Sequence, residues 1–510
     1  MKVLLVYPRF PETFWSFKHA LRFINKKAAH PPLGLLTVAG MLPPDWELKL
    51  VDENVIPLDD ADLAWADYVF LSAMAVQQER VRAIIGRCQS LGRKIVAGGP
   101  LFTVSWEDYP EIDHLVLGEA EITLPRFLAD LGAGSPRHLY RPGPGEWADL
   151  SVTPIPRWDL LAMKAYNAMS LQYSRGCPFD CEFCDITLLY GRQPRTKGKE
   201  QILAELESLY RHGWRGGVFM VDDNFIGNKK ALKEEILPAL EDWLAARNHP
   251  FTFNTQVSIN LADDDELLAA MVRVGFESVF IGIETPHEGS LTECGKVQNK
   301  NRDLLAAVKK IQRHGLQVQG GFILGFDSDP PTIFDRQIAF IQESGIVTAM
   351  VGLLTVLKGT KLYRRLEAEG RILTESSGDN TGRQLNFLPK MPWEKLLAGY
   401  KEVTTTLYSP RAFYRRVIAF LKEYNPPPGR KIHLRPEHGV ALVKAIFWLG
   451  IWDKHRVYFW RLLGWSLLRK PRVFPLAVTF TIYGYHFRRF FLEQAEPVPV
   501  PLGAADPSTV

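Results

Sequence analysis

The most specific chemistry in this sequence comes from three cysteines that lie within eight positions of one another. Cys177, Cys181 and Cys184 follow a short apolar run and the tripeptide Ser174-Arg175-Gly176, so all three thiols fall on one tight loop. Three thiolates can bind three irons of a cubane cluster and leave the fourth iron open to another ligand. The spacing therefore predicts a [4Fe–4S] cluster with one free coordination position.

A zinc site is the main alternative for these thiols. Structural zinc needs four closed ligands, and these nearly always include a second CxxC pair or histidines at a fixed spacing. No second pair occurs here, although Cys294, more than a hundred positions away, is not excluded as a distant fourth ligand. An isolated cysteine is usually a small buried hydrophobe. We therefore favour the cluster.

The cysteine loop belongs to a region in which strands and helices alternate. Strands are expected at 170–174, 217–221, 251–258, 278–284, 317–324 and 348–354. Six βα units in series predict a partial (βα)6, TIM-like barrel. Ligands of such barrels bind at the carboxyl ends of the strands.

A second alternating region precedes the barrel. Strands are expected at 3–7, 47–52, 68–72, 94–97 and 114–117, with covering helices that include 33–41 and 78–91. This pattern predicts an α/β domain with a doubly wound, Rossmann-like parallel sheet. Its ligand would lie beyond the carboxyl ends of the strands.

Proline and glycine divide the chain into domains. The stretch 135–156 is rich in both residues and cannot continue a helix or a central strand. After about residue 370 the strand pattern stops and a helical pattern follows. We predict a first domain at 1–135, a linker at 136–160, the barrel at 161–375, a helical domain at 376–495 and a disordered tail at 496–510.

Charge is concentrated near the C-terminus. Residues 411–492 carry 16 Lys and Arg against 3 Asp and Glu, a net +13 in a chain whose total is only +4, which leaves −9 elsewhere. The basic, aromatic segment 444–491 could lie on an anionic membrane surface. Alternatively, its aromatic side chains pack onto the barrel. Nothing else in the sequence supports nucleic acid as a partner.

The cellular compartment is inferred from the cysteines and the hydropathy. The five cysteines are an odd number and do not form a secreted disulfide framework. The N-terminus lacks the features of a signal peptide, and no apolar stretch is long enough to span a bilayer. We expect a cytoplasmic protein, membrane-associated if the basic segment lies on a bilayer.

The motif Cys-x3-Cys-x2-Cys after the first strand of a βα barrel resembles the signature of the radical S-adenosylmethionine (SAM) superfamily. The resemblance covers nearly the whole chain, and it implies that SAM chelates the open iron of the cluster. It also implies that Phe183 packs near the adenine and that SAM contacts residues at the strand ends. These are Asp222, Asp223, Gln256, Ser258, Glu284, Gly320 and Gly325. Each is also a common type of strand-end or turn residue.

The first domain resembles the cobalamin-binding domain that precedes many radical SAM barrels. The resemblance implies cobalamin contacts from loops at the carboxyl edge of the sheet, at Pro8, Pro32, Gly34, Ser72, Ala73, Met74, Val76, Gly98, Gly99, Pro100, Gly118 and Glu119. Glycines there let a large planar ligand approach, but they also make ordinary turns. The sequence lacks the Asp-x-His-x-x-Gly motif of the mutases, so no protein histidine is expected on the cobalt.

The helical C-terminal part resembles the domain that follows the barrel in hopanoid and bacteriochlorophyll methylases, a subset that segments 291–299 and 386–389 also match. This resemblance implies a C-methyltransferase acting on an unactivated carbon of a lipid or tetrapyrrole-like substrate. A 5′-deoxyadenosyl radical would abstract hydrogen, and methylcobalamin would supply the methyl group. A flavodoxin or ferredoxin would supply the electron. The alternatives are a cyclase or rearranging enzyme without net methyl transfer, and a non-catalytic cobalamin- or metal-binding protein.

Overall fold

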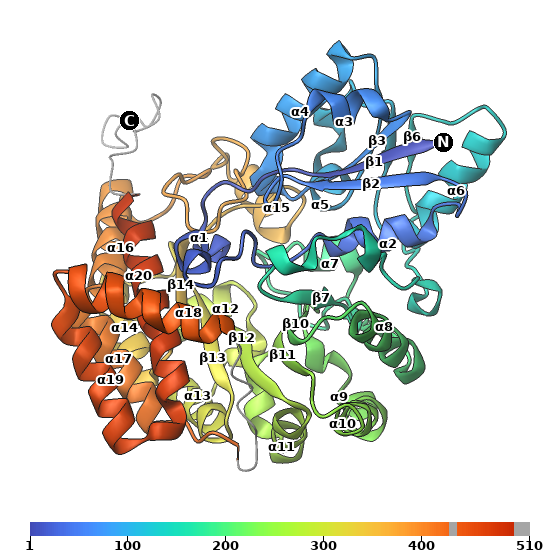
Figure 1. Cartoon of the computed structure of the whole chain (residues 1–510). Helices are drawn as coiled ribbons and strands as arrows, with labels where there is room; N and C mark the ends of the chain where they lie inside the picture. The colour runs from blue at the N-terminus through green and yellow to red at the C-terminus, as the bar shows by residue number, and fades with distance from the viewer. Residues whose placement is uncertain (428–435, 494–510) are drawn as a thin grey trace, which may run out of the picture.

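Two six-stranded parallel sheets form the scaffold of the molecule, and a group of helices completes it at the C-terminal end (Figure 1). The computed structural model describes residues 1–427 and 436–493. The predicted disordered tail, 496–510, lies outside the described residues. Within the described ranges, no helix has both the length and the hydropathy that crossing a bilayer requires.

The N-terminal sheet has the strand order β2-β1-β3-β4-β5-β6. Its strands are β1 (Lys2–Tyr7), β2 (Glu47–Asp52), β3 (Tyr68–Ser72), β4 (Lys94–Gly98), β5 (His114–Val116) and β6 (Leu139–Tyr140). The accompanying helices are α1 (Lys18–Leu21), α2 (Leu33–Met41), α3 (Asp60–Trp65), α4 (Gln78–Ser90), α5 (Pro100–Ser105) and α6 (Ala120–Gly132). The sheet thus continues into the stretch 136–160 that the sequence marks as a linker.

Alternation along β1 explains why this sheet is covered on both faces. Leu4 and Val6 pack with the cluster formed by α3, α4 and α5, whereas Val3 and Leu5 pack with α2 and α6. Successive side chains of a strand point to opposite faces, so an apolar run buries both sides. The doubly wound fold is confirmed.

The second sheet is an open, partial barrel with the order β14-β13-β12-β11-β10-β7. Its strands are β7 (Met169–Leu171), β10 (Gly216–Met220), β11 (Phe251–Gln256), β12 (Phe276–Glu284), β13 (Gln317–Leu324) and β14 (Ala349–Leu353). The helices between them are α7 (Ile186–Tyr190), α8 (Lys199–Arg211), α9 (Lys229–Ala231), α10 (Leu237–Ala245), α11 (Asp265–Val274), α12 (Glu288–Glu293), α13 (Leu304–Arg313) and α14 (Ile333–Ser344), and α15 (Lys361–Ala368) follows β14. The predicted (βα)6 barrel is confirmed.

The first predicted barrel strand, 170–174, is divided in two. After β7 the backbone N–H groups of Tyr173 and Ser174 donate to the carboxylate of Asp222 instead of to a neighbouring strand. The chain then forms β8 (Ser174–Arg175), which pairs antiparallel with β9 (Arg195–Thr196). This turn directs the cysteine loop away from the sheet.

Helices make up the C-terminal domain, as the sequence predicts. They are α16 (Trp393–Leu407), α17 (Pro410–Glu423), α18 (Pro436–Ala445), the π-helical turn η12 (Ile446–Trp452), α19 (Arg456–Arg469) and α20 (Phe474–Glu493). Their buried side chains join those of the barrel in one continuous core. The domain is therefore packed on the barrel rather than tethered to it.

A segment from the N-terminal domain covers the open side of the barrel. Trp15 Nε1 donates to Met350 Sδ in β14 at 2.9 Å, and Ala28 bridges to Tyr166 just before β7. Phe14 of the same segment stacks on Phe487 of α20, with ring centroids 4.4 Å apart. Residues 14–28 thus run from β14 to the start of β7, backed by α20 (Figure 1).

Candidate functional site

The cysteine loop begins at a glycine that no other residue could replace without strain. Gly176 has φ +93°, and a Cβ atom there would lie 2.8 Å from the carbonyl oxygen of Gln193. Its N–H donates to the carboxylate of Asp223 at 3.0 Å. The loop is therefore fixed at its first residue by a turn that L side chains rarely adopt.

The three thiols of the loop are free and largely shielded from water. Cys181 is buried, and Cys177 and Cys184 are half-buried. Burial raises the pKa of all three thiols, that of Cys184 to about 12, while the ammonium of Lys296 acts in the opposite direction. Uncomplexed thiols here stay protonated, so binding metal must release protons.

The donor set fits a multi-iron cluster better than a single zinc ion. Among the described residues, no three His, Cys, Asp or Glu side chains converge as the ligands of one ion would. In a cubane cluster each thiolate binds a different iron, so three thiols spread along one loop suit it. The Cys294 thiol is buried and lies 3.7 Å from the carbonyl oxygen of Leu291, while its backbone oxygen accepts from Glu182 N–H at 2.9 Å.

Asp222 and Asp223, at the end of β10, support the cysteine loop from behind. Asp222 is fully buried and accepts hydrogen bonds from Tyr173 and Ser174, including one from Ser174 Oγ at 2.6 Å. Burial raises the pKa of Asp222 to about 7 and that of Asp223 to about 6. Both carboxyls thus position the backbone that precedes the cluster.

The end of β12 brings a cation to the loop. Glu284, in a left-handed backbone conformation, forms an ion pair with Lys296 at 2.6 Å. Two residues further on, Gln298 Nε2 lies 3.9 Å from Cys181 Sγ. Segment 291–299 matches the methylase subset in sequence, but that match gave none of its residues a role. The spacing along the chain does not show that this segment folds back onto the cysteines, so Lys296 and Gln298 were not predicted as site residues.

The remaining predicted SAM residues lie at other strand ends. The ring of Phe183 lies 6.2 Å from that of Phe326, which follows Gly325 at the end of β13. Gly320 lies further down β13, and Gln256 ends β11. Ser258 Oγ donates to Asn260 Oδ1 at 2.6 Å. The structure thus brings Phe183 next to the Gly325 turn, and SAM contact by this set stays a prediction.

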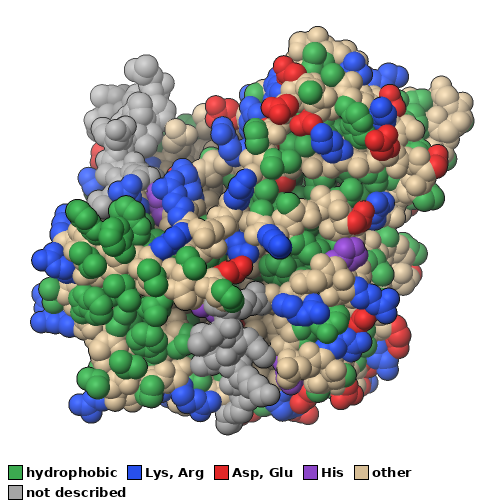
Figure 2. All heavy atoms as spheres, in the orientation of Figure 1, with side chains coloured by type: hydrophobic (Ala, Val, Ile, Leu, Met, Phe, Trp, Pro, Cys, Tyr) green, Lys and Arg blue, Asp and Glu red, His purple; other side chains and the backbone are tan. Residues whose placement is uncertain are grey.

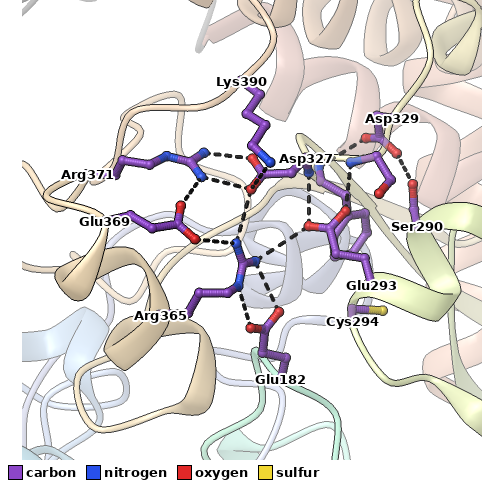
Figure 3. A network of polar contacts seen from close by, with 12 residues as sticks. Glu182, Ser290, Glu293, Cys294, Asp327, Asp329, Arg365, Glu369, Arg371 and Lys390 are labelled. Atoms are coloured by element: carbon purple, nitrogen blue, oxygen red, sulfur yellow. Dashed lines mark hydrogen bonds and ion pairs between the residues drawn. The ribbon is translucent and has the colours of Figure 1, made fainter.

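A network of charged side chains clamps the loop to the barrel (Figure 3). Glu182 pairs with Arg365 of α15 at 2.6 Å, and Arg365 reaches Asp327 at 3.1 Å. Arg371 pairs with the other oxygen of Asp327 at 2.6 Å. Although burial opposes it, hydrogen bonds from Arg371 and Arg365 lower the pKa of Asp327 to about 2. The clamp therefore stays charged at any physiological pH.

The predicted cobalamin residues lie on loops at the carboxyl ends of neighbouring strands. Gly99 has φ +90°, and a Cβ atom there would lie 2.5 Å from Ser72 Oγ. Ala73 O accepts from Leu101 N–H in α5 at 3.0 Å, and the Pro8 carbonyl accepts from the buried Gln77 amide. The loops after β1, β3 and β4 are therefore joined, and Gly99 is required by the protein's own packing whatever ligand it meets.

The other predicted cobalamin residues differ in their exposure and in what surrounds them. The side chain of Met74 is 49% exposed and free to meet a ligand. Next to it, the backbone at Val76 contacts Gly378, from the loop between α15 and α16. Pro32 and Gly34 lie at the start of α2, where Gly34 has open space around it. Gly98 ends β4, Pro100 begins α5 and Gly118 follows β5. Contact between cobalamin and any of these residues stays a prediction.

Two arginines of the barrel join the predicted cobalamin loop to the cysteine loop. Arg175, two residues before Cys177, pairs with Glu119 at 3.0 Å and with Glu121 at 2.8 Å. Arg195 also pairs with Glu119, at 2.9 Å, and the Glu119 side chain is only 2% exposed. Glu119 is thus held by the barrel. No sequence signal pairs residues so far apart, so both arginines were missed.

Comparison with known proteins agrees with this arrangement. Three family models match the chain: the B12 binding domain at residues 22–128, the Radical SAM superfamily at 171–332 and a domain of unknown function at 360–497. The chain is 41% identical to an uncharacterized methyltransferase of Synechocystis sp., over 96% of this chain and 92% of the relative. It is 34% identical to the hopanoid C-2 methylase of Rhodopseudomonas palustris, over 92% of this chain and 90% of the relative.

Solved structures share the fold over the whole length. The radical SAM methyltransferase TsrM from Kitasatospora setae, with cobalamin and a [4Fe–4S] cluster bound, superposes with a TM-score of 0.62 at 14% identity. The match covers 97% of this chain and all of that one.

Proposed function

Because the chain belongs to the radical SAM superfamily, in the group with a B12-binding domain ahead of the barrel, we propose that it methylates an unactivated carbon of a lipid or tetrapyrrole-like molecule. The observation that carries the proposal is the bridge from Arg175 to Glu119 and Glu121, which joins the predicted cobalamin loop to the cysteine loop. The chain is an enzyme that uses a [4Fe–4S] cluster, SAM and cobalamin.

The chain's own residues hold and shield these groups. When bound, the cluster with SAM supplies hydrogen abstraction and cobalamin supplies a methyl group. Cys177, Cys181 and Cys184 would hold the cluster, with Lys296 as a fixed positive charge beside them. The Glu182–Arg365 clamp keeps the loop from moving, and residues 14–28 exclude water from the open side of the barrel.

The wall that residues 14–28 form is our candidate for substrate contact. The ring of Trp15 lies edge-on to Phe280 of β12, with centroids 5.5 Å apart. Just after this segment, the His30 ring lies 5.0 Å from that of Phe219 of β10, and burial lowers the pKa of His30 to about 4, so it is neutral. Aromatic rings with a neutral imidazole next to them suit a hydrophobic substrate.

Replacing Trp15 by Ala should therefore lower kcat/KM for methylation by about 10- to 100-fold, because a poorly placed substrate reacts slowly. Cleavage of SAM without substrate should change little, since the contacts described above for Trp15 are with Phe280 of β12 and Met350 of β14 and not with the cysteine loop. Trp46→Ala, before β2, is the control. Equal loss of both activities would argue against a role in substrate binding.

Substrate class, electron donor and location complete the proposal. The hopanoid C-2 methylase relative supports a lipid over a tetrapyrrole. We expect a flavodoxin- or ferredoxin-type protein as electron donor. The free thiols suit a cytoplasmic location. We also propose contact between the basic C-terminal helices and a membrane.

An anaerobic assay tests the reaction class. The full-length protein is reconstituted with iron, sulfide and hydroxocobalamin, then supplied with SAM, reductant and candidate lipids. Formation of S-adenosylhomocysteine beside 5′-deoxyadenosine, with a methylated product, is the expected result. Formation of 5′-deoxyadenosine alone with an altered substrate would favour a cyclase or rearranging enzyme. Cobalamin binding without SAM cleavage would favour the non-catalytic alternative.

A further inference from the structure

One face of the C-terminal domain exposes large apolar side chains. On the continuous helix of α18 and η12, the most exposed are Val443 at 67% and Trp452 at 69%. On α19, Leu467 and Leu468 are 58% and 83% exposed. Isolated exposed hydrophobics are ordinary, but a group of this size marks an interaction surface. We call it the apolar face.

The two helices pack side by side, so their exposed residues form one surface. Trp460 Nε1 of α19 donates to the carbonyl oxygen of Gly450 in η12 at 2.9 Å. A Cβ atom at Gly450 would lie 3.0 Å from the rings of Phe459 and Trp460, so the backbones meet closely. Figure 2 shows hydrophobic side chains gathered over α18 and α19, with Lys and Arg around them.

The surroundings of the apolar face are strongly basic. Lys454, Arg461 and Arg469 are exposed, and no acidic side chain of the described residues pairs with them. Between residues 441 and 492 the sequence contains one acidic residue, Asp453. Asp453 is in turn neutralised by Arg488. The positive charge of this region is therefore available to a partner.

A basic hollow adjoins the apolar face. It has a volume of about 700 Å³ and lies between α17, α19 and the ends of α13 and α14. Arg411, Arg415 and Arg461 line it together with Tyr458, whose ring stacks on that of Tyr414 with centroids 5.9 Å apart. Two carboxylates, Glu343 and Glu423, also line it, and Glu423 is paired with Arg313 at 2.8 Å. Guanidinium groups around an open hollow are suited to phosphate.

We propose that the apolar face inserts into the interface of an anionic lipid bilayer and that the adjoining arginines and lysines bind the lipid phosphates. Amphipathic helices with Trp, Phe and Leu on one side and Lys or Arg beside them bind membranes in this way. A second copy of the chain would present the same positive charge and be repelled. The inference deepens the membrane contact named in the proposed function and does not depend on methyl transfer.

Vesicle sedimentation of the reconstituted, full-length protein tests this inference. The protein should sediment with vesicles of phosphatidylcholine and phosphatidylglycerol, and much less with phosphatidylcholine alone. The double substitution Arg461→Glu and Arg469→Glu should weaken binding by about 25-fold or more, because each basic residue near an anionic surface contributes about fivefold. High salt should release the wild-type protein, since salt screens surface charge.

A second pair of variants separates insertion from charge. Trp448→Ser with Trp452→Ser should weaken binding by about tenfold or more, because apolar area no longer enters the bilayer. The matched control is Ile56→Ser with Val152→Ser, two exposed apolar residues far from α19 in the sequence, which should bind normally.

Two results would overturn the inference. One is equal sedimentation with neutral and anionic vesicles. The other is a wild-type dimer that the Trp448 and Trp452 substitutions convert to a monomer without loss of vesicle binding. Formation of 5′-deoxyadenosine with a soluble reductant, measured on the same preparations, reports the enzyme separately. Failure of vesicle binding would thus leave the proposed reaction intact. Failure of 5′-deoxyadenosine formation would likewise leave the membrane contact intact.

Discussion

Replacing Cys181 by Ala should abolish SAM cleavage, with 5′-deoxyadenosine formation falling by about 10⁴-fold or more, as when a group essential to a chemical step is removed. Cys181 is the buried member of the three thiols, and two thiolates on the loop cannot replace the third iron ligand. Iron and sulfide content, visible absorbance and nucleoside formation should fall together. Cobalamin binding should remain, because its predicted loops belong to another domain.

Cys294→Ala is the matched control for that experiment. Cys294 is buried like Cys181, but its thiol lies against the carbonyl of Leu291. The Cys294→Ala protein should therefore keep its cluster and cleave SAM. A cluster lost from Cys294→Ala and kept in Cys181→Ala would instead make Cys294 a ligand and contradict the assignment.

The second large effect is expected at Arg175. Changing it to Met leaves Glu121, only 2% exposed, without its cation. Breaking a buried ion pair by removing one partner costs about 3–5 kcal/mol, so the unfolding free energy should fall by about that amount. Denaturant unfolding at neutral pH measures it. Arg192→Met, which removes an exposed pair with Asp180 at 3.4 Å, should change stability by less than about 1 kcal/mol.

The pH dependence of this effect has a definite sign. Although burial opposes it, hydrogen bonds and charge from Arg175 lower the pKa of Glu121 from 4.5 to about 2. A carboxyl with a depressed folded-state pKa stabilises the protein above its unfolded pKa, and this stabilisation is lost as pH falls towards 2. In Arg175→Met the buried carboxyl prefers its proton. The loss of unfolding free energy in the variant, relative to the wild type, should therefore be larger at pH 8 than at pH 5. An equal loss at both pH values would contradict the pairing of Arg175 with Glu121.

The sequence predicted those features that depend on local pattern. Strands such as 68–72 and 317–324 have their predicted bounds, because a continuous apolar run bounded by turn residues has few other conformations. The cysteine motif was found for a similar reason, since three ligands within eight positions must share a loop. The apolar runs and the cysteine spacing can each be recognised within a short stretch of the sequence.

What the sequence did not predict depends on residues far apart in the chain. Tyr173 and Ser174 leave the first strand because Asp222, 48 positions away from Ser174, accepts their N–H groups. Arg175 is held by carboxylates of another domain. The exposure of Trp452 also could not be read from its pattern, because a buried and an exposed aromatic helix can have the same composition. The packing of η12 on α19 decides between them.

The stacking of Phe14 on α20 also bears on how this protein is made. The barrel wall at residues 14–28 is backed by a helix whose contact residue, His486, lies 472 positions later in the chain. Domains of a nascent chain fold as they emerge, and contacts between distant residues form last. We therefore expect the barrel to remain open during synthesis and to close only as α20 leaves the ribosome. A truncated chain without α20 would lack the backing of this wall, so we expect its SAM cleavage to be less well coupled to the substrate.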